Sequence, residues 1–188
     1  MELKLLCIGD VVGSPGRRVL QEGLPVLVER YGVESVIVNA ENAAAGSGLT
    51  QDLYQKIVRC GVHLITMGDH IYRRKEIIPT LETADNIVRP ANLPAAAPGR
   101  EAAVYQTASG QSVAVVSVLG RMFMKTPVNC PMAAVDRVLA SLLISVGWVS
   151  RRWAVRGENR RESVPPRRAG VPRFTTSLFK LTGGIPVT

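Results

Sequence analysis

The chain has 188 residues, of which 46% are hydrophobic and 20% are charged, and its formal net charge is +8. That length holds one domain, or one domain with an appendage, and the composition argues against a wholly disordered chain. The cysteines are odd in number and far apart, which argues against a disulfide framework; Cys7 and Cys60 are expected to be small core residues in a reducing compartment. The apolar runs are too short for a signal peptide or a membrane-spanning helix, so we expect a cytoplasmic protein.

Strand and helix patterns alternate over residues 3–89. Apolar and β-branched runs predict strands at residues 3–8, 35–39, 62–67 and 86–89. Apolar residues at helical spacing predict helices at residues 17–31, 50–60 and 74–82. Gly23 and Pro25 are expected to kink or split the first helix, and Thr50 to cap the second. This alternation predicts a parallel sheet with right-handed crossovers.

The pattern changes after Pro90. A turn signal at Ser109-Gly110 separates two apolar segments and predicts an antiparallel hairpin of residues 103–107 and 112–119, followed by a helix at 133–144. Residues 143–188 carry nine Lys/Arg and two Asp/Glu, a charge of +7, whereas residues 1–142 carry only +1. We therefore predict one domain over residues 1–146 and a disordered, basic Arg/Pro-rich tail over residues 147–188.

Carboxylates follow three of the predicted strands. Asp10 comes just after the first strand, Glu41 after the second and Asp69 after the third. Parallel strands end at one edge of a sheet, where α/β folds bind ligands, so the three side chains are expected to lie close together. Three converging anions repel one another, and a divalent cation between them would remove that conflict. His70 adds an imidazole, usable as a ligand or a general acid, and Asn42 could orient Glu41 or bind a metal itself.

Plain structural alternatives remain open for these positions. Asp10 could be the N-cap of the next helix, and Asp69-His70 could be a simple turn. His63 lies within a strand pattern and is expected to be structural, while residues 73–75 are expected to form a solvated charged face.

Several segments, in this order, resemble the YmdB-like branch of the bacterial calcineurin-like metallophosphoesterases. The resemblance covers residues 1–142 and rests on Ile8-Gly9-Asp10-Val11-Val12-Gly13-Ser14-Pro15-Gly16, on Asn39-Ala40-Glu41-Asn42-Ala43-Ala44 with Gly46 and Gly48-Leu49-Thr50, on Thr66-Met67-Gly68-Asp69-His70, and on Arg89-Pro90-Ala91-Asn92. It implies an αββα sandwich, incomplete here, with a parallel βαβαβ half followed by a β-hairpin and a helix. It also implies a centre of two divalent metal ions, iron or manganese, that hydrolyses phosphodiesters such as cyclic nucleotides.

The resemblance also implies roles for particular residues. Asp10 and Glu41 would be metal ligands, with Glu41 bridging, and Asn42 lies in the same motif. Asp69 stands where the family has an Asn ligand, and His70 would protonate the leaving group or steady the transition state. The chain has no Gly-Thr-His-Thr-His stretch like that of the family's second half, and its only histidines are His63 and His70. The second metal site is therefore expected to be incomplete and activity impaired; the tail has the composition of a shifted reading frame or a truncated gene product.

Three functions remain as hypotheses. The first is a metallophosphoesterase in which a metal-activated water attacks a phosphodiester or cyclic nucleotide substrate. The second is a non-catalytic binder whose tail engages nucleic acid or another polyanion weakly and without sequence preference. The third is a metal-free nucleotide-binding domain using the glycine loops at residues 9–13 and 46–48, although neither loop matches a dinucleotide or ATP-binding pattern. No membrane partner is expected, and homo-oligomerisation is left open.

Overall fold

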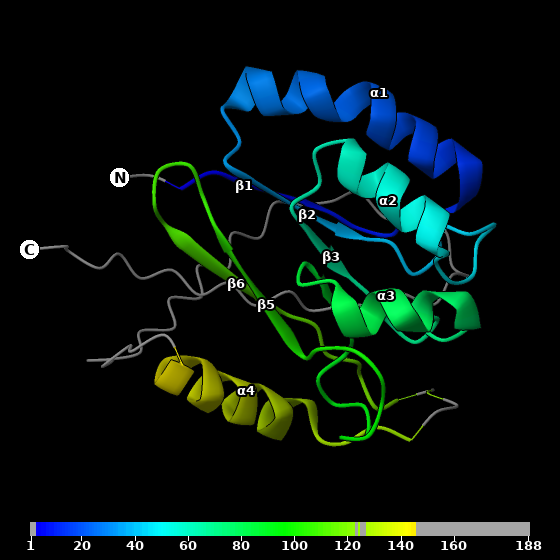
Figure 1. Cartoon of the computed structure of the whole chain (residues 1–188), viewed down its shortest axis with the longest axis vertical. Coiled ribbons are helices and arrows are strands. Elements are labelled where there is room, and N and C mark those ends of the chain that lie inside the picture. The colour runs from blue at the N-terminus through cyan, green and yellow to red at the C-terminus, as the bar shows by residue number, and fades with distance from the viewer. Residues whose placement is uncertain (1–2, 123, 125–126, 146–188) are drawn as a thin grey trace, which may run out of the picture.

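The computed structural model describes residues 3–122, 124 and 127–145 (Figure 1). The predicted tail at residues 147–188 lies outside the described residues, so its disorder and its binding of polyanions stay predictions. No described helix is both long and apolar enough to cross a membrane.

Four parallel strands form the central sheet, in the order β1-β2-β3-β4. They are Leu5–Ile8, Ser35–Asn39, Leu64–Thr66 and Ile87–Val88. The prediction of a parallel sheet from alternating strands and helices is confirmed. All five residues of β2 are buried, because this strand has a neighbour on each side and a layer on each face.

Helices cover one face of this sheet. They are α1 (Gly13–Tyr31), α2 (Gln51–Arg59) and α3 (Ile78–Thr83), the last preceded by the 3-10 turn η1 (Lys75–Ile77). Their apolar side chains share one core with those β2 and β3 residues that point towards them, including Val36, Val38 and Ile65. Figure 1 shows these helices on one side of β1–β3.

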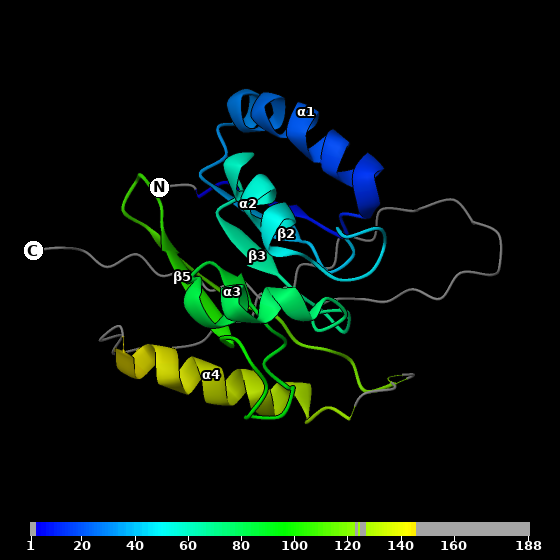
Figure 2. The ribbon, with the colours of Figure 1, turned by 45° about the vertical axis from the view of Figure 1, so that its right-hand side comes forward.

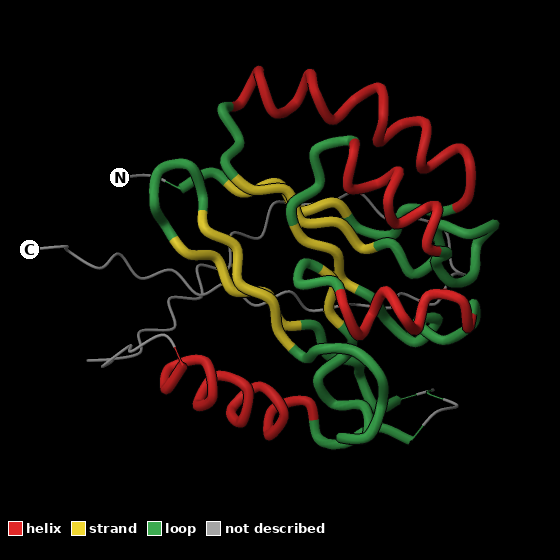
Figure 3. Tube along the Cα trace, in the orientation of Figure 1, coloured by secondary structure: helices red, strands yellow, loops and turns green. Residues whose placement is uncertain are grey.

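An antiparallel hairpin covers the opposite face of the sheet. It consists of β5 (Ala102–Gln106) and β6 (Ser112–Val116), and it packs on Ile37, Leu64 and Val88 of the central sheet. The helix α4 (Pro131–Ser145) in turn packs on Val116 and Val118 through its own residues Ala134, Val135 and Val138. The layers therefore run helix, sheet, hairpin, helix, which confirms the predicted αββα arrangement (Figures 2 and 3). The described part of the second sheet holds two strands.

Two expectations from the sequence were wrong in detail. The helix α1 is not split at Gly23 or Pro25 but continues through both, because residue 25 lies on the solvent side, where water can hydrogen-bond the carbonyl that proline leaves without a partner. Cys7 is exposed rather than in the core, because β1 is the edge strand of the described sheet. Cys60 is half-buried against the core, and Thr50 caps α2 as predicted, its side chain accepting from the Leu53 N–H at 3.2 Å.

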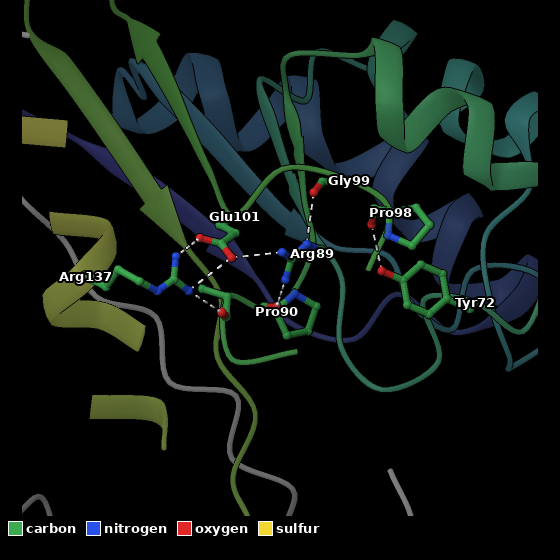
Figure 4. Close-up of polar contacts among 8 residues, drawn as sticks. Tyr72, Arg89, Pro90, Pro98, Gly99, Glu101 and Arg137 are labelled. Atoms are coloured by element: carbon green, nitrogen blue, oxygen red, sulfur yellow. Dashed lines mark hydrogen bonds and ion pairs between the residues drawn. The ribbon is translucent and has the colours of Figure 1, made fainter. Parts of the chain in front are cut away.

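A buried arginine joins the layers. Arg89, only 3% exposed, donates to the carbonyls of Gly99 and Pro90, each at 3.0 Å, and to the Glu101 carboxylate at 2.9 Å (Figure 4). Arg137 of α4 reaches the same carboxylate from the other side. Burial raises the pKa of Glu101, but the hydrogen bonds and charges of Arg137 and Arg89 outweigh it and hold that pKa below its ordinary value. Glu101 thus neutralises a buried cation and ties α4 to the end of the sheet.

Glu101→Gln should lower the free energy of unfolding at pH 7 by about 2 kcal/mol, because it leaves the buried Arg89 without its counter-charge. The folded-state pKa of Glu101 is lowered, so the stabilisation is present above the ordinary carboxyl pKa of 4.5 and is lost as the pH falls through the folded-state pKa. Urea titrations of the two proteins across acidic pH measure this difference. The exposed Glu82→Gln is the matched control; an equal loss in both variants would contradict the role assigned to Glu101.

Candidate active site

Backbone hydrogen bonds hold the loop after β1 against the loop after β2. The Val11 N–H donates to the Asn39 carbonyl and the Gly13 N–H to the Asn42 carbonyl, each at 3.0 Å. Between these ties, Asp10 has a positive φ of 48°, a left-handed conformation that Asp tolerates better than most residues. The loop after β1 therefore presents the Asp10 side chain to the loop after β2.

Asp10 and His70 are joined through the Asn42 side chain. The Asn42 Nδ2 donates to Asp10 Oδ1 at 2.6 Å, and Asn42 Oδ1 lies 2.5 Å from His70 Nδ1. Because the ionised Asp10 can only accept, it fixes which end of the Asn42 amide faces it. The Asn42 oxygen then faces the imidazole, so Nδ1 carries the proton and Nε2 is left for other partners.

Glu41 is the buried member of the group, with 8% of its surface exposed. Its Oε2 accepts from the backbone N–H of His70 at 3.0 Å. Burial raises the pKa of Glu41; the His70 N–H lowers it, and the negative charge of Asp69 raises it further, with a smaller effect from Asp10. The pKa of Glu41 is raised overall, with burial at the end of β2 as the main cause.

Asp69 lies at the open side of the group. Its side chain is 42% exposed, and its Oδ2 lies 3.7 Å from His70 Nε2. All five residues singled out in the sequence thus lie at one edge of the sheet, in one linked set of contacts and charges. Within the described residues, however, no three His, Cys, Asp or Glu side chains are grouped closely enough to hold one metal ion. The carboxylate and amide oxygens at this edge have the chemistry that a divalent cation prefers.

Gly68 makes room for the Glu41 carboxylate, a role that sequence reasoning missed. A Cβ at residue 68 would lie well inside contact distance of both carboxylate oxygens of Glu41. Asn39, at the end of β2, is also buried, and among the described residues neither end of its amide has a hydrogen-bond partner. The only sequence signal for either residue was its place inside a motif with family resemblance.

The structure also tests the purely structural explanations that the sequence left open for these positions. Asp10 is not a helix cap, because Val12 occupies the N-cap position of α1 and makes no side-chain cap. His63 is structural, as predicted: its Nδ1 accepts from the Val36 N–H at 3.0 Å and its ring packs on Tyr105. Arg73 and Arg74 are exposed and lie against Gly48.

A model of the YmdB-like protein family matches residues 6–148. The chain is 41% identical over 138 residues to the 2',3'-cyclic-nucleotide 2'-phosphodiesterase of Bacillus subtilis (strain 168), a match that covers 73% of this chain and 52% of that protein. Among solved structures, it is similar to a hypothetical protein from Thermus thermophilus, with 39% identity and a TM-score of 0.66 over 72% of this chain and 52% of that one. It is also similar to a Mycoplasma pneumoniae phosphatase, with 27% identity and a TM-score of 0.68 over 74% and 51% of the two chains. This chain therefore spans about half the length of the B. subtilis relative and of both solved structures.

Gly68→Ala should displace the Glu41 carboxylate, and any Mn²⁺ binding in which Glu41 takes part should weaken about tenfold or more, as losses in the groups that orient metal ligands commonly do. Gly120→Ala is the matched control, since a Cβ there meets nothing within 4 Å. Calorimetric titration with Mn²⁺, together with thermal unfolding of both variants, measures the effect. Unchanged Mn²⁺ affinity in folded Gly68→Ala would show that Glu41 does not need this space.

Asn42→Leu should remove the contact that fixes which nitrogen of His70 carries the proton. When the imidazole ring is uncharged, ¹⁵N chemical shifts of the wild type are expected to show the proton on Nδ1 of His70. The variant should gain the form with the proton on Nε2. His63 is an internal control, because its Nδ1 accepts from the Val36 N–H and its proton stays on Nε2 in both proteins. An identical His70 spectrum in both proteins would contradict the orienting role of Asn42.

Proposed function

This chain belongs to the YmdB-like protein family, and we propose that it is a metal-dependent phosphoesterase that hydrolyses phosphodiesters, cyclic nucleotides among them. The observation that carries the proposal is the linked group at the carboxyl edge of the sheet, where Asp10, Asn42 and His70 are connected beside the buried Glu41. The names of the Bacillus and Mycoplasma relatives, a cyclic-nucleotide phosphodiesterase and a phosphatase, support the same chemistry.

In this proposal Asp10, Glu41, Asn42 and Asp69 hold divalent metal, iron or manganese. A bound divalent cation would supply Lewis-acid chemistry: it would polarise the phosphodiester and activate water for attack. The arrangement of charges supports this assignment, since a cation would neutralise the buried Glu41 carboxylate and offset the smaller repulsions from Asp69 and Asp10. The Asn42 oxygen already contacts His70, so we give Asn42 an orienting role first and a ligand role second.

His70 is the proposed general acid. The Asp10–Asn42 pair holds its Nδ1 proton, so in the protonated ring the Nε2–H points away from Asn42 and is available to the leaving oxygen. The exposed Asp69 carboxylate lies 3.7 Å from Nε2, on the side of the ring where the leaving oxygen would be protonated.

We further propose that this chain holds a second metal ion poorly. The sequence contains two histidines, and His63 is engaged with the backbone of β2. His70 is therefore the one imidazole available at this edge, whereas a dinuclear centre with nitrogen ligands needs more. Activity should accordingly be slow.

The test is hydrolysis of bis(p-nitrophenyl) phosphate by the full chain with added Mn²⁺. We expect slow turnover that a chelator abolishes, a loss of about 100-fold in His70→Ala from removal of the general acid, and Mn²⁺ affinity about tenfold weaker in Glu41→Gln. Glu82→Gln, at an exposed position of α3, is the control and should change neither quantity.

Two outcomes separate the alternatives. Turnover that does not respond to the chelator, or that survives His70→Ala unchanged, would overturn the proposed mechanism. Rapid turnover with two metal ions bound per chain would instead overturn the expectation of impairment alone.

A further inference from the structure

A cavity of about 390 Å³ opens beside Asp69. Its volume lies within the range of about 300–1,000 Å³ that is usual for small-molecule sites. The residues that line it come from the turn after β3, from the segment after β4 and from the segment after β6: Asp69, Ile71, Tyr72, Leu93, Pro94, Ala96, Ala97 and Leu119. Asp69 therefore belongs both to the proposed metal site and to the cavity wall.

Hydrogen bonds hold the walls of this cavity in place. The Tyr72 hydroxyl donates to the Pro98 carbonyl at 2.7 Å, as Figure 4 shows, and this bond ties the turn after β3 to the segment after β4. The Ala97 N–H donates to the Pro94 carbonyl at 2.9 Å and closes a turn in that segment. The fully buried Asn92 exchanges two hydrogen bonds of 2.8 Å with the backbone of Leu119. The cavity is thus preformed rather than a gap between loose loops.

The chemistry of the lining selects the kind of group that can enter. Apart from Asp69 at one side, the lining side chains are aliphatic, proline or the tyrosine ring, and none of them is Lys or Arg. A second phosphate group would find no positive charge there. A flat, largely apolar ring would find aliphatic contacts and an aromatic ring on which bases commonly stack.

We propose that this cavity holds the base of a nucleotide whose phosphodiester lies at Asp69 and His70. The proposal rests on the proposed function for the position of the phosphodiester. It makes the preferred substrate a nucleoside phosphodiester rather than a simple alkyl one, because base binding in the cavity holds the phosphorus next to the imidazole.

The test is the binding of adenosine, which has a base but no phosphate and therefore needs no metal. NMR titration of the full chain should shift the backbone amides of residues 71–72, 96–97 and 119. Ala96→Trp fills the cavity from an exposed position and should weaken adenosine binding about tenfold or more. Ala95→Trp is the matched control, because Ala95 is also exposed, adjacent in sequence and outside the lining.

The possible results separate base binding in the cavity from hydrolysis of the phosphodiester. Adenosine binding by the wild type, lost in Ala96→Trp and kept in Ala95→Trp, supports the proposal even if no hydrolysis is found, in which case only the proposed function fails. Absence of any adenosine-induced shift at the lining residues overturns the proposal without touching the metal chemistry. Equal affinities in the wild type and Ala96→Trp, or equal losses in the two variants, overturn it as well.

Discussion

The parallel pairing of β2 with β1 and with β3 is the constraint on which the candidate site depends. Both pairings are parallel, with Cys7 opposite Ile37 and Ile37 opposite Leu64. The three strands therefore run in the same direction and end at one edge of the sheet. Each functional side chain then follows its strand closely: Asp10 and Glu41 lie two positions after the end of their strands, and Asp69 lies three. A register shift of one residue in β2 would exchange the faces of the strand and move Glu41 relative to its neighbours.

Three features at this edge work against folding stability. Glu41 is a buried carboxylate with a raised pKa, and Asp10 has a left-handed backbone. Asn39 is buried, and within the described residues its amide has no hydrogen-bond partner. Buried charge, unusual backbone and unsatisfied polar groups each cost free energy, and their concentration at one place is typical of a functional site rather than of a packing core. Gly68 belongs with them, because its lack of a side chain lets the carboxylate approach the backbone.

The sequence predicted what periodicity and strand order control. Strand alternation gave the parallel sheet, and the carboxylates after three strands pointed to a shared edge. Periodicity alone did not reveal that Asn42 would contact Asp10 and His70 rather than Glu41, because that depends on side-chain directions in two loops. It also gave Cys7 the wrong environment: an apolar run looks the same at a sheet edge as in its centre, and only strand order separates the two. Pro25 was misjudged for a related reason, since its effect on a helix depends on which side faces water.

The phosphodiester and the base of the proposed substrate would depend on different layers of the fold. The acid–base group stands on the loops after β1, β2 and β3, while much of the cavity wall comes from residues 93–97 and from Leu119, which leads away from the hairpin. Asn92 connects these regions, because its side chain holds Leu119 and also donates to the Asn129 carbonyl, just before α4. Loosening the hairpin and α4 should therefore disturb the cavity first and leave the Asp10–Asn42–His70 contacts in place. The layer that completes the sandwich would then govern which phosphodiester is bound, and the first sheet would govern what is done to it.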